Sequence, residues 1–110
     1  MSDWHMSADA ILGKLKAAPE GKQAFYPLQH GSLRAGVYAP SSQDRQEPHD
    51  QDELYVVIRG IGSFVKGGET RSFKPGDAIF VEAGTDHAFT EFSEDFATWM
   101  IFWGPKGGEH

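Results

Sequence analysis

The chain has 110 residues, a length that suits one domain with its own hydrophobic core. Its net charge of −6 argues against a nucleic-acid partner, and its lack of cysteine excludes disulfides and thiolate metal sites. No apolar run approaches the ~20 residues of a membrane span. The first residues also lack the basic and apolar regions of a signal peptide, so we expect a cytoplasmic protein with no nucleic-acid or membrane partner.

Residues 7–18 form the one convincing helical segment. Ser7 can cap its N-terminus. Its apolar residues recur at the spacing of one helix face, namely Ala8, Ile11, Leu12 and Leu15. A helix this short is marginal alone, so we predict that the N-terminal segment, residues 1–23, packs on the rest of the domain.

After Gly21 the pattern changes to short strand-like runs separated by turns. We expect about eight strands, at residues 24–28, 32–39, 54–59, 63–66, 70–73, 78–81, 88–92 and 98–103. Short strands with frequent glycine and proline turns are typical of an antiparallel sandwich or barrel. We therefore predict a mainly β fold, with a barrel over residues 24–104 and a loose C-terminal tail over residues 105–110.

Metal-binding side chains stand directly before the most strand-like run. His49 and Glu53 are four residues apart, and four residues of straight strand span ~13 Å. That separation suits two ligands of one ion poorly, because metal–ligand bonds are ~2.0–2.2 Å long. The turn-forming residues between them must therefore bend the chain. His87 follows a glycine turn at the start of a later strand, and together the three would supply two imidazoles and a carboxylate, the ligand set of a non-haem metal centre with open positions.

The spacing of these residues also resembles that of a known family. The run Glu47-x-His49-x3-Glu53-x6-Gly60 resembles the first cupin motif, normally G-x5-H-x-H-x3–4-E-x6-G. Glu47 stands where the first histidine should be, and the leading glycine of the motif is absent.

The second cupin motif has a counterpart as well. The run Gly76-x5-Glu82-x-Gly84-x2-His87-x3-Glu91 resembles G-x5-P-x-G-x2-H-x3-N. Glu82 replaces the proline, and Glu91 replaces the asparagine. The gap between the two motifs is that of small single-domain cupins.

The resemblance implies a double-stranded β-helix, which is the jelly-roll barrel of cupins. It also implies that His49, Glu53 and His87 are three of the usual four metal ligands. Glu47 would be the fourth, nearly neutralising a divalent ion, or else a solvated loop residue that leaves room for substrate. The ion would be divalent iron, manganese, zinc or nickel. The alternative is an emptied site in which the two histidines form hydrogen bonds within a polar pocket.

Strand parity predicts which residues line the pocket. Tyr55 continues the face of Glu53, and Phe89 and Glu91 continue the face of His87. Glu91, like Glu47, is a candidate catalytic base.

Two further residues of the predicted pocket lie on an earlier strand. Arg34 and Tyr38 lie two steps either side of Gly36, so both could point into the barrel. Arg34 could then bind a substrate carboxylate through two hydrogen bonds, although a surface arginine is the simpler reading.

These observations favour a metal-dependent enzyme of the dioxygenase or isomerase type that acts on a small organic molecule. The alternatives are a non-catalytic cupin that binds or senses a small ligand, and a barrel that mainly mediates assembly. The unbroken apolar run at residues 99–103 predicts burial on both faces, and hence a homodimer.

Overall fold

The protein is described by a computed structural model over residues 4–18, 23–41, 44 and 48–109. It begins with one helix, α1 (Ala8–Ala17). Eight strands follow in chain order: β1 (Ala24–His30), β2 (Leu33–Tyr38), β3 (Asp52–Arg59), β4 (Gly62–Lys66), β5 (Glu69–Phe73), β6 (Ala78–Val81), β7 (His87–Phe92) and β8 (Ala97–Trp103).

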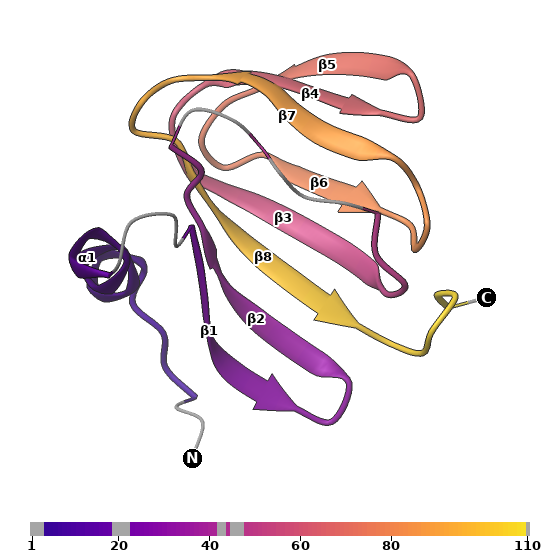
Figure 1. Ribbon diagram of the computed structural model, residues 1–110, viewed down its shortest axis with the longest axis horizontal. Coiled ribbons are helices and arrows are strands. Elements are labelled where there is room, and N and C mark those ends of the chain that lie inside the picture. The colour runs from indigo at the N-terminus through magenta and orange to yellow at the C-terminus, as the bar shows by residue number, and fades with distance from the viewer. Residues whose placement is uncertain (1–3, 19–22, 42–43, 45–47, 110) are drawn as a thin grey trace.

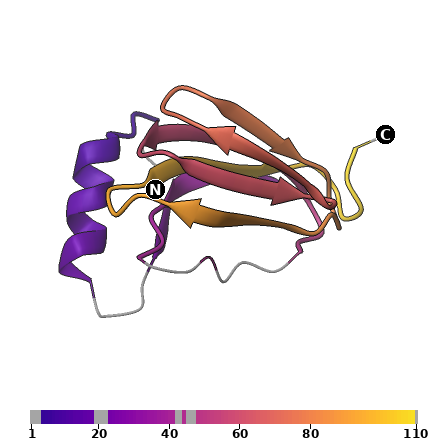
Figure 2. The same ribbon diagram turned by 90° about the horizontal axis from the view of Figure 1, so that it is seen from above.

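The strands form two antiparallel sheets that face each other (Figures 1 and 2). The larger sheet has the order β1-β2-β8-β3-β6, and the smaller sheet has the order β5-β4-β7. Neighbouring strands in both sheets are often distant in sequence, as a jelly roll requires. The predicted mainly β jelly-roll fold with one short helix is confirmed.

Cross-strand register places side chains in rows on the inner face of the larger sheet. One row, near the start of β3, consists of Arg34, Phe102, Glu53 and Val81. A row at the opposite end consists of Tyr38, Thr98 and Val57. Between the sheets lies the main core, which is rich in aromatic rings. Its fully buried members include Tyr55, Phe89, Phe96 and Met100.

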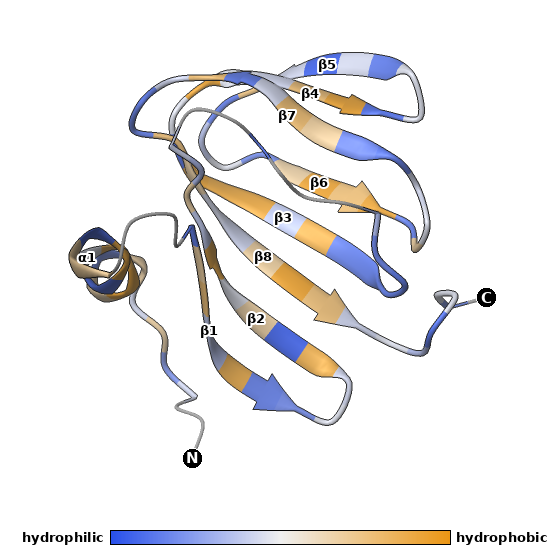
Figure 3. Cartoon of the chain, viewed as in Figure 1, coloured by the Kyte–Doolittle hydropathy of each residue, from blue (hydrophilic) through white to orange (hydrophobic). Residues whose placement is uncertain are grey.

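Helix α1 covers one end of the larger sheet. The Ser7 hydroxyl accepts a hydrogen bond from the backbone N–H of Ala10 at 3.3 Å, which caps the helix as predicted. Ile11 packs with Val37 and Ala97 in a second core cluster. This cluster lies at the end of the larger sheet that is farther from Glu53. Figure 3 shows that β3 and β8 of the larger sheet carry many apolar residues, whereas β5 of the smaller sheet is polar. In the part of the chain that is described, no helix has the length and apolar character to cross a membrane.

The C-terminal tail is ordered, so the prediction of a loose tail is wrong for the described residues up to 109. The N–H of Gly107 donates to the carbonyl of Asp50 at 2.8 Å, and the N–H of Glu109 donates to the Asp52 carboxylate at 3.0 Å. Gly108 is buried against Asp52. These long-range contacts cannot be read from the local glycine and proline composition.

Candidate metal centre

Three side chains from separate parts of the chain meet at one end of the barrel. His49 precedes β3, Glu53 lies at the start of β3, and His87 begins β7. His49 Nε2 lies 2.7 Å from Glu53 Oε1, and His87 Nε2 lies 3.5 Å from the same oxygen. Each residue offers one ligand atom within 4.8 Å of the others, so the group could hold a metal ion. These are three of the four ligand candidates that the resemblance to the cupin motifs implied.

Backbone carbonyls fix both imidazole rings. His49 Nδ1 lies 2.6 Å from the carbonyl oxygen of Gln51, and His87 Nδ1 lies 2.9 Å from that of Thr85. Because a carbonyl only accepts, both Nδ1 atoms carry the proton. The Nε2 atom of each ring therefore faces Glu53 and is the one available to a metal.

Two polar atoms in this group are buried without a hydrogen-bond partner among the described residues. They are Glu53 Oε2 and His87 Nε2. The 3.5 Å contact between His87 and Glu53 is an ion-pair distance, too long for a good hydrogen bond. Such orphaned atoms are costly in a protein interior, and a divalent cation would satisfy both, so the residues present fit a metal ion.

Burial and charge act in opposite directions on His87. Burial lowers its pKa, but the Glu53 carboxylate and the Thr85 carbonyl outweigh burial, so the pKa is raised overall. The negative charge of Glu53 therefore attracts positive charge at this position, as expected beside a cation site.

The chain between His49 and Glu53 bends as the spacing requires. The N–H of Gly84 donates to the carbonyl of His49 at 2.7 Å, and the N–H of Ala83 donates to the buried Asp52 carboxylate at 3.0 Å. Both contacts tie the His49 segment to the turn that precedes His87. The turn thus positions two ligands at once.

Three residues predicted to line the pocket fill the barrel interior instead of an open space. Tyr38, Tyr55 and Phe89 are at most 4% exposed. The rings of Tyr55 and Phe89 lie 4.9 Å apart, and the Tyr55 ring lies 6.2 Å from that of His87. Tyr38 lies at the other end of the sheet, where its hydroxyl donates to Asp44 at 2.5 Å.

Arg34 does point into the barrel, in the same inner-face row as Glu53. Its guanidinium carbon lies 4.6 Å from the ring centroid of Tyr26 and 4.6 Å from that of Phe102. The Phe102 ring in turn lies 4.8 Å from the His49 ring. Phe102 and Tyr26 therefore connect Arg34 to the metal group.

Sequence reasoning missed both of these aromatic residues. Phe102 is hidden in a continuous apolar run that gives no parity signal, and a register shift between Phe25 and Leu28 obscures the facing of Tyr26. Burial raises the pKa of Tyr26, although Arg34 lowers it, and Glu53 adds to the rise. The phenol therefore keeps its proton and acts as a hydrogen-bond donor at neutral pH.

The prediction that Glu91 shares the inner face of His87 is wrong. The register between β4 and β7 shifts between Ser63 and Phe64, so that Phe64 pairs with Phe89 while Ser63 pairs with Glu91. This bulge turns Glu91 to the surface, where it is exposed. Glu47, the other candidate base and possible fourth ligand, lies outside the described residues.

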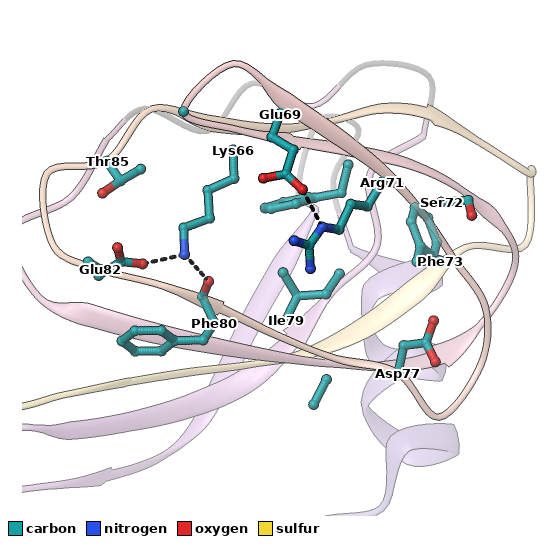
Figure 4. A pocket seen from close by; sticks show the side chains of 13 residues that line it. Lys66, Glu69, Arg71, Ser72, Phe73, Asp77, Ile79, Phe80, Glu82 and Thr85 are labelled. Atoms are coloured by element: carbon teal, nitrogen blue, oxygen red, sulfur yellow. Dashed lines mark hydrogen bonds and ion pairs between the residues drawn. The ribbon is translucent and has the colours of Figure 1, made fainter.

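A separate hollow of about 650 Å³ opens between β4, β5 and β6 (Figure 4). Its rim carries two ion pairs, Lys66 with Glu82 and Arg71 with Glu69. None of the three candidate ligands lines it. Phe64, which does line it, stands 6.0 Å ring to ring from His87 and separates the hollow from the metal group.

The cupin domain matches residues 36–103 of this sequence, a span that contains all three candidate ligands. The protein belongs to the cupin family. This cupin is 33% identical over 93 residues to the uncharacterized protein SCO3923 of Streptomyces coelicolor, covering 83% of this chain and 88% of that protein.

Solved structures share the cupin fold at lower identity. A Rhizobium leguminosarum protein of unknown function superposes with a TM-score of 0.76 at 20% identity, covering 96% of this chain and 100% of that one. A Ralstonia eutropha protein, to which mannose-6-phosphate isomerase activity is provisionally attributed, superposes with a TM-score of 0.66 at 20% identity, covering 79% of this chain and 91% of that one. At these identities the likeness shows the fold alone.

Proposed function

We propose that this cupin binds a divalent metal ion through His49, Glu53 and His87 and acts on a small organic molecule beside that ion, as a dioxygenase or an isomerase. The observation that carries the proposal is the convergence of two Nε2 atoms and a fully buried carboxylate within 4.8 Å.

The bound ion would supply a Lewis acid with open coordination positions. The chain's own residues prepare the site. The carbonyls of Gln51 and Thr85 hold the two imidazoles in the metal-binding tautomer. The rings of Tyr55 and Phe64 pack beside His87 and exclude water from the inner side of the group. The side chain of His49 is 16% exposed, while those of Glu53 and His87 are fully buried, so a ligand would approach past His49.

Elemental analysis of protein made without a histidine tag tests the metal site. We expect close to one divalent ion per chain in the wild type and a near-complete loss in His49→Ala and in His87→Ala. His30→Ala is the matched control, since His30 is exposed at the end of β1 and should leave metal content unchanged. Full metal content in either ligand variant would refute the assignment.

The enzymatic part of the proposal needs its own measurement. Oxygen uptake, or isomerisation followed by NMR, would be measured with the metal-loaded protein and a panel of small carbonyl and enol compounds. Turnover that disappears in His87→Ala and persists in His30→Ala supports an enzyme. Metal-dependent binding without turnover supports the second candidate.

That second candidate is a non-catalytic cupin that binds or senses a small ligand. The exposure of Glu91 favours it, because the bulge in β7 removes this carboxylate from the face that carries His87. One of the two candidate bases, Glu91, is then absent from the site, and the other, Glu47, lies outside the described residues.

We also propose that the protein is a homodimer in the cytoplasm. On the outer face of the larger sheet, beyond the end covered by α1, Leu54 lies between Ile101 and Phe80 in one apolar row. Phe80 is 44% exposed and stacks near Trp103. Light scattering should give the mass of a dimer for the wild type and of a monomer for Phe80→Asp. A monomeric wild type would refute the dimer.

A further inference from the structure

Arg34 has an unusual setting for an arginine in a protein of negative net charge. It is half-buried, and its guanidinium lies over two aromatic rings, those of Tyr26 and Phe102. Among the described residues, no carboxylate lies within ion-pair distance of it, whereas Lys66, Arg71 and Lys74 each pair with an acid. Within the described part of the chain, the positive charge of Arg34 therefore has no ion-pair partner.

The centroids of the two rings lie only 6.3 Å apart, so both rings contact the guanidinium from adjoining sides. Among the described residues, none accepts a hydrogen bond from its N–H groups. Stacking on a ring stabilises the charge, yet the five N–H donors of an arginine point outward in the plane of the group. That arrangement presents a planar fork of donors, whose natural partner is a carboxylate with two oxygens.

Arg34 lies in the same inner-face row as Glu53 of the metal group. Arg34 and Glu53 both pair with Phe102, from the strands on either side of it, so all three share one face. One strand separates their α-carbons, a distance of about 10 Å. Phe102 also contacts the ring of His49, and the charges of both Arg34 and Glu53 act on the phenol of Tyr26. The side chains between Arg34 and the metal group are therefore aromatic.

The local charge points the same way. A divalent ion with one carboxylate and two neutral imidazoles leaves one positive charge, and Arg34 adds a second. The rest of the chain is strongly acidic, with a net charge of −6, so it repels anions in general. Only an anion that reaches both local charges is favoured.

We propose that Arg34 binds the carboxylate of a small organic acid whose second oxygen function reaches the His49–Glu53–His87 group. This inference rests on the proposed metal-dependent function and adds the class of ligand to it. The acid is a compound with a carboxylate at one end and a carbonyl or hydroxyl oxygen several bonds away, lying over the Phe102 ring.

A series of keto acids tests the inference. Pyruvate, levulinate and 5-oxohexanoate place the ketone successively farther from the carboxylate, and the amide of each is its neutral control. Binding to untagged metal-loaded protein would be measured by calorimetry. We expect at least one acid to bind more tightly than its amide, and Arg34→Met to weaken that acid about tenfold to a hundredfold while leaving the amide unchanged.

Two further variants separate charge from geometry. Arg34→Lys keeps the charge but loses the planar arrangement of N–H donors. Its affinity for the acid should therefore lie between those of the wild type and Arg34→Met. Arg71→Met removes the same charge from an exposed pair on β5 and should bind the acids like the wild type. Metal content and melting temperature, measured for all variants, show that each remains folded and loaded.

The outcomes distinguish this inference from the proposed function. Equal acid affinity in Arg34→Met and wild type, no preference for acid over amide, or tighter binding of inorganic phosphate than of any keto acid would each overturn it. Absence of metal from the wild type would refute the metal site alone. In that case a preference for acid over amide in the metal-free protein, lost in Arg34→Met, would still support Arg34.

Discussion

Replacing Glu53 by glutamine should raise the stability of the metal-free protein and lower its affinity for metal. The carboxylate is fully buried, with Oε1 2.7 Å from His49 Nε2 and Oε2 without a partner among the described residues. Both imidazoles present Nε2 to this carboxylate while their Nδ1 protons are used by backbone carbonyls. At a pH above the raised pKa of His87, a neutral imidazole presents Nε2 as an acceptor, so that acceptor faces the acceptor oxygens of Glu53.

A glutamine at position 53 would keep the volume, remove the buried charge and offer two N–H donors to these atoms. A buried polar atom without a partner costs about 1–3 kcal/mol. We therefore expect metal-free Glu53→Gln to be more stable than the wild type by about 1–3 kcal/mol. At about 4 °C per kcal/mol for a domain of this size, the melting temperature should rise by roughly 4–12 °C.

Metal should reverse this order. A ligand present at 100 times its Kd stabilises a protein by about 2.7 kcal/mol, and Glu53→Gln should lose most of that gain. Urea unfolding at one pH above the raised pKa of His87, with EDTA and then with zinc or manganese, measures both the stability of the metal-free protein and the gain from metal. Glu91→Gln is the control, because the same change at an exposed residue should stay within about 0.5 kcal/mol of the wild type.

Two results would refute this reasoning. If metal-free Glu53→Gln is less stable than the wild type, the buried carboxylate is better satisfied than its contacts indicate. If metal stabilises the variant and the wild type equally, Glu53 is not a ligand.

Three further changes test the elements around the site. Asp52→Asn should lower stability by about 1–3 kcal/mol in urea, because one of two backbone N–H groups would face an amide instead of a carboxylate oxygen; unchanged stability would show that the C-terminal tail is not held there. Gly62→Ala places a Cβ 1.9 Å from a carbonyl oxygen of β7 and should destabilise by about 1–3 kcal/mol, whereas Gly13→Ala, in open space on α1, should stabilise by about 0.5–1 kcal/mol. Hydrogen bonds from Lys74 lower the pKa of Asp77, so the stability advantage of the wild type over Asp77→Asn should be present at pH 7 and shrink as the pH falls below about 3.9; an advantage that grows in acid would contradict this sign.

Local sequence predicted the elements of this fold closely. The helix begins after Ser7 because a cap and an apolar face are properties of neighbouring residues. The strands end at glycine and proline turns for the same reason. The three candidate ligands also followed from spacing, since a family motif records which distant residues meet.

The face of the sheet on which each side chain lies was less predictable. Parity holds along β3, where Glu53, Tyr55 and Val57 are all buried. It fails along β7, where the register shift places Glu91 on the surface. Gly62 lies opposite this irregularity. The carbonyl of Glu91 approaches it so closely that no side chain would fit there. A bulge depends on the partner strand, which a single strand's pattern does not contain.

The sequence by itself determined a β-rich domain with one capped helix and its turns, and it predicted His49, Glu53 and His87 as candidate metal ligands. Only the tertiary structure decided that Arg34 contacts the rings of Tyr26 and Phe102 in the row of Glu53, and that residues 107–109 hold the loop of His49 in place. The physical reason is the range of the interactions. Caps, turns and alternation act over a few residues, whereas a stacked guanidinium or a buried carboxylate is satisfied by groups that folding brings from distant parts of the chain.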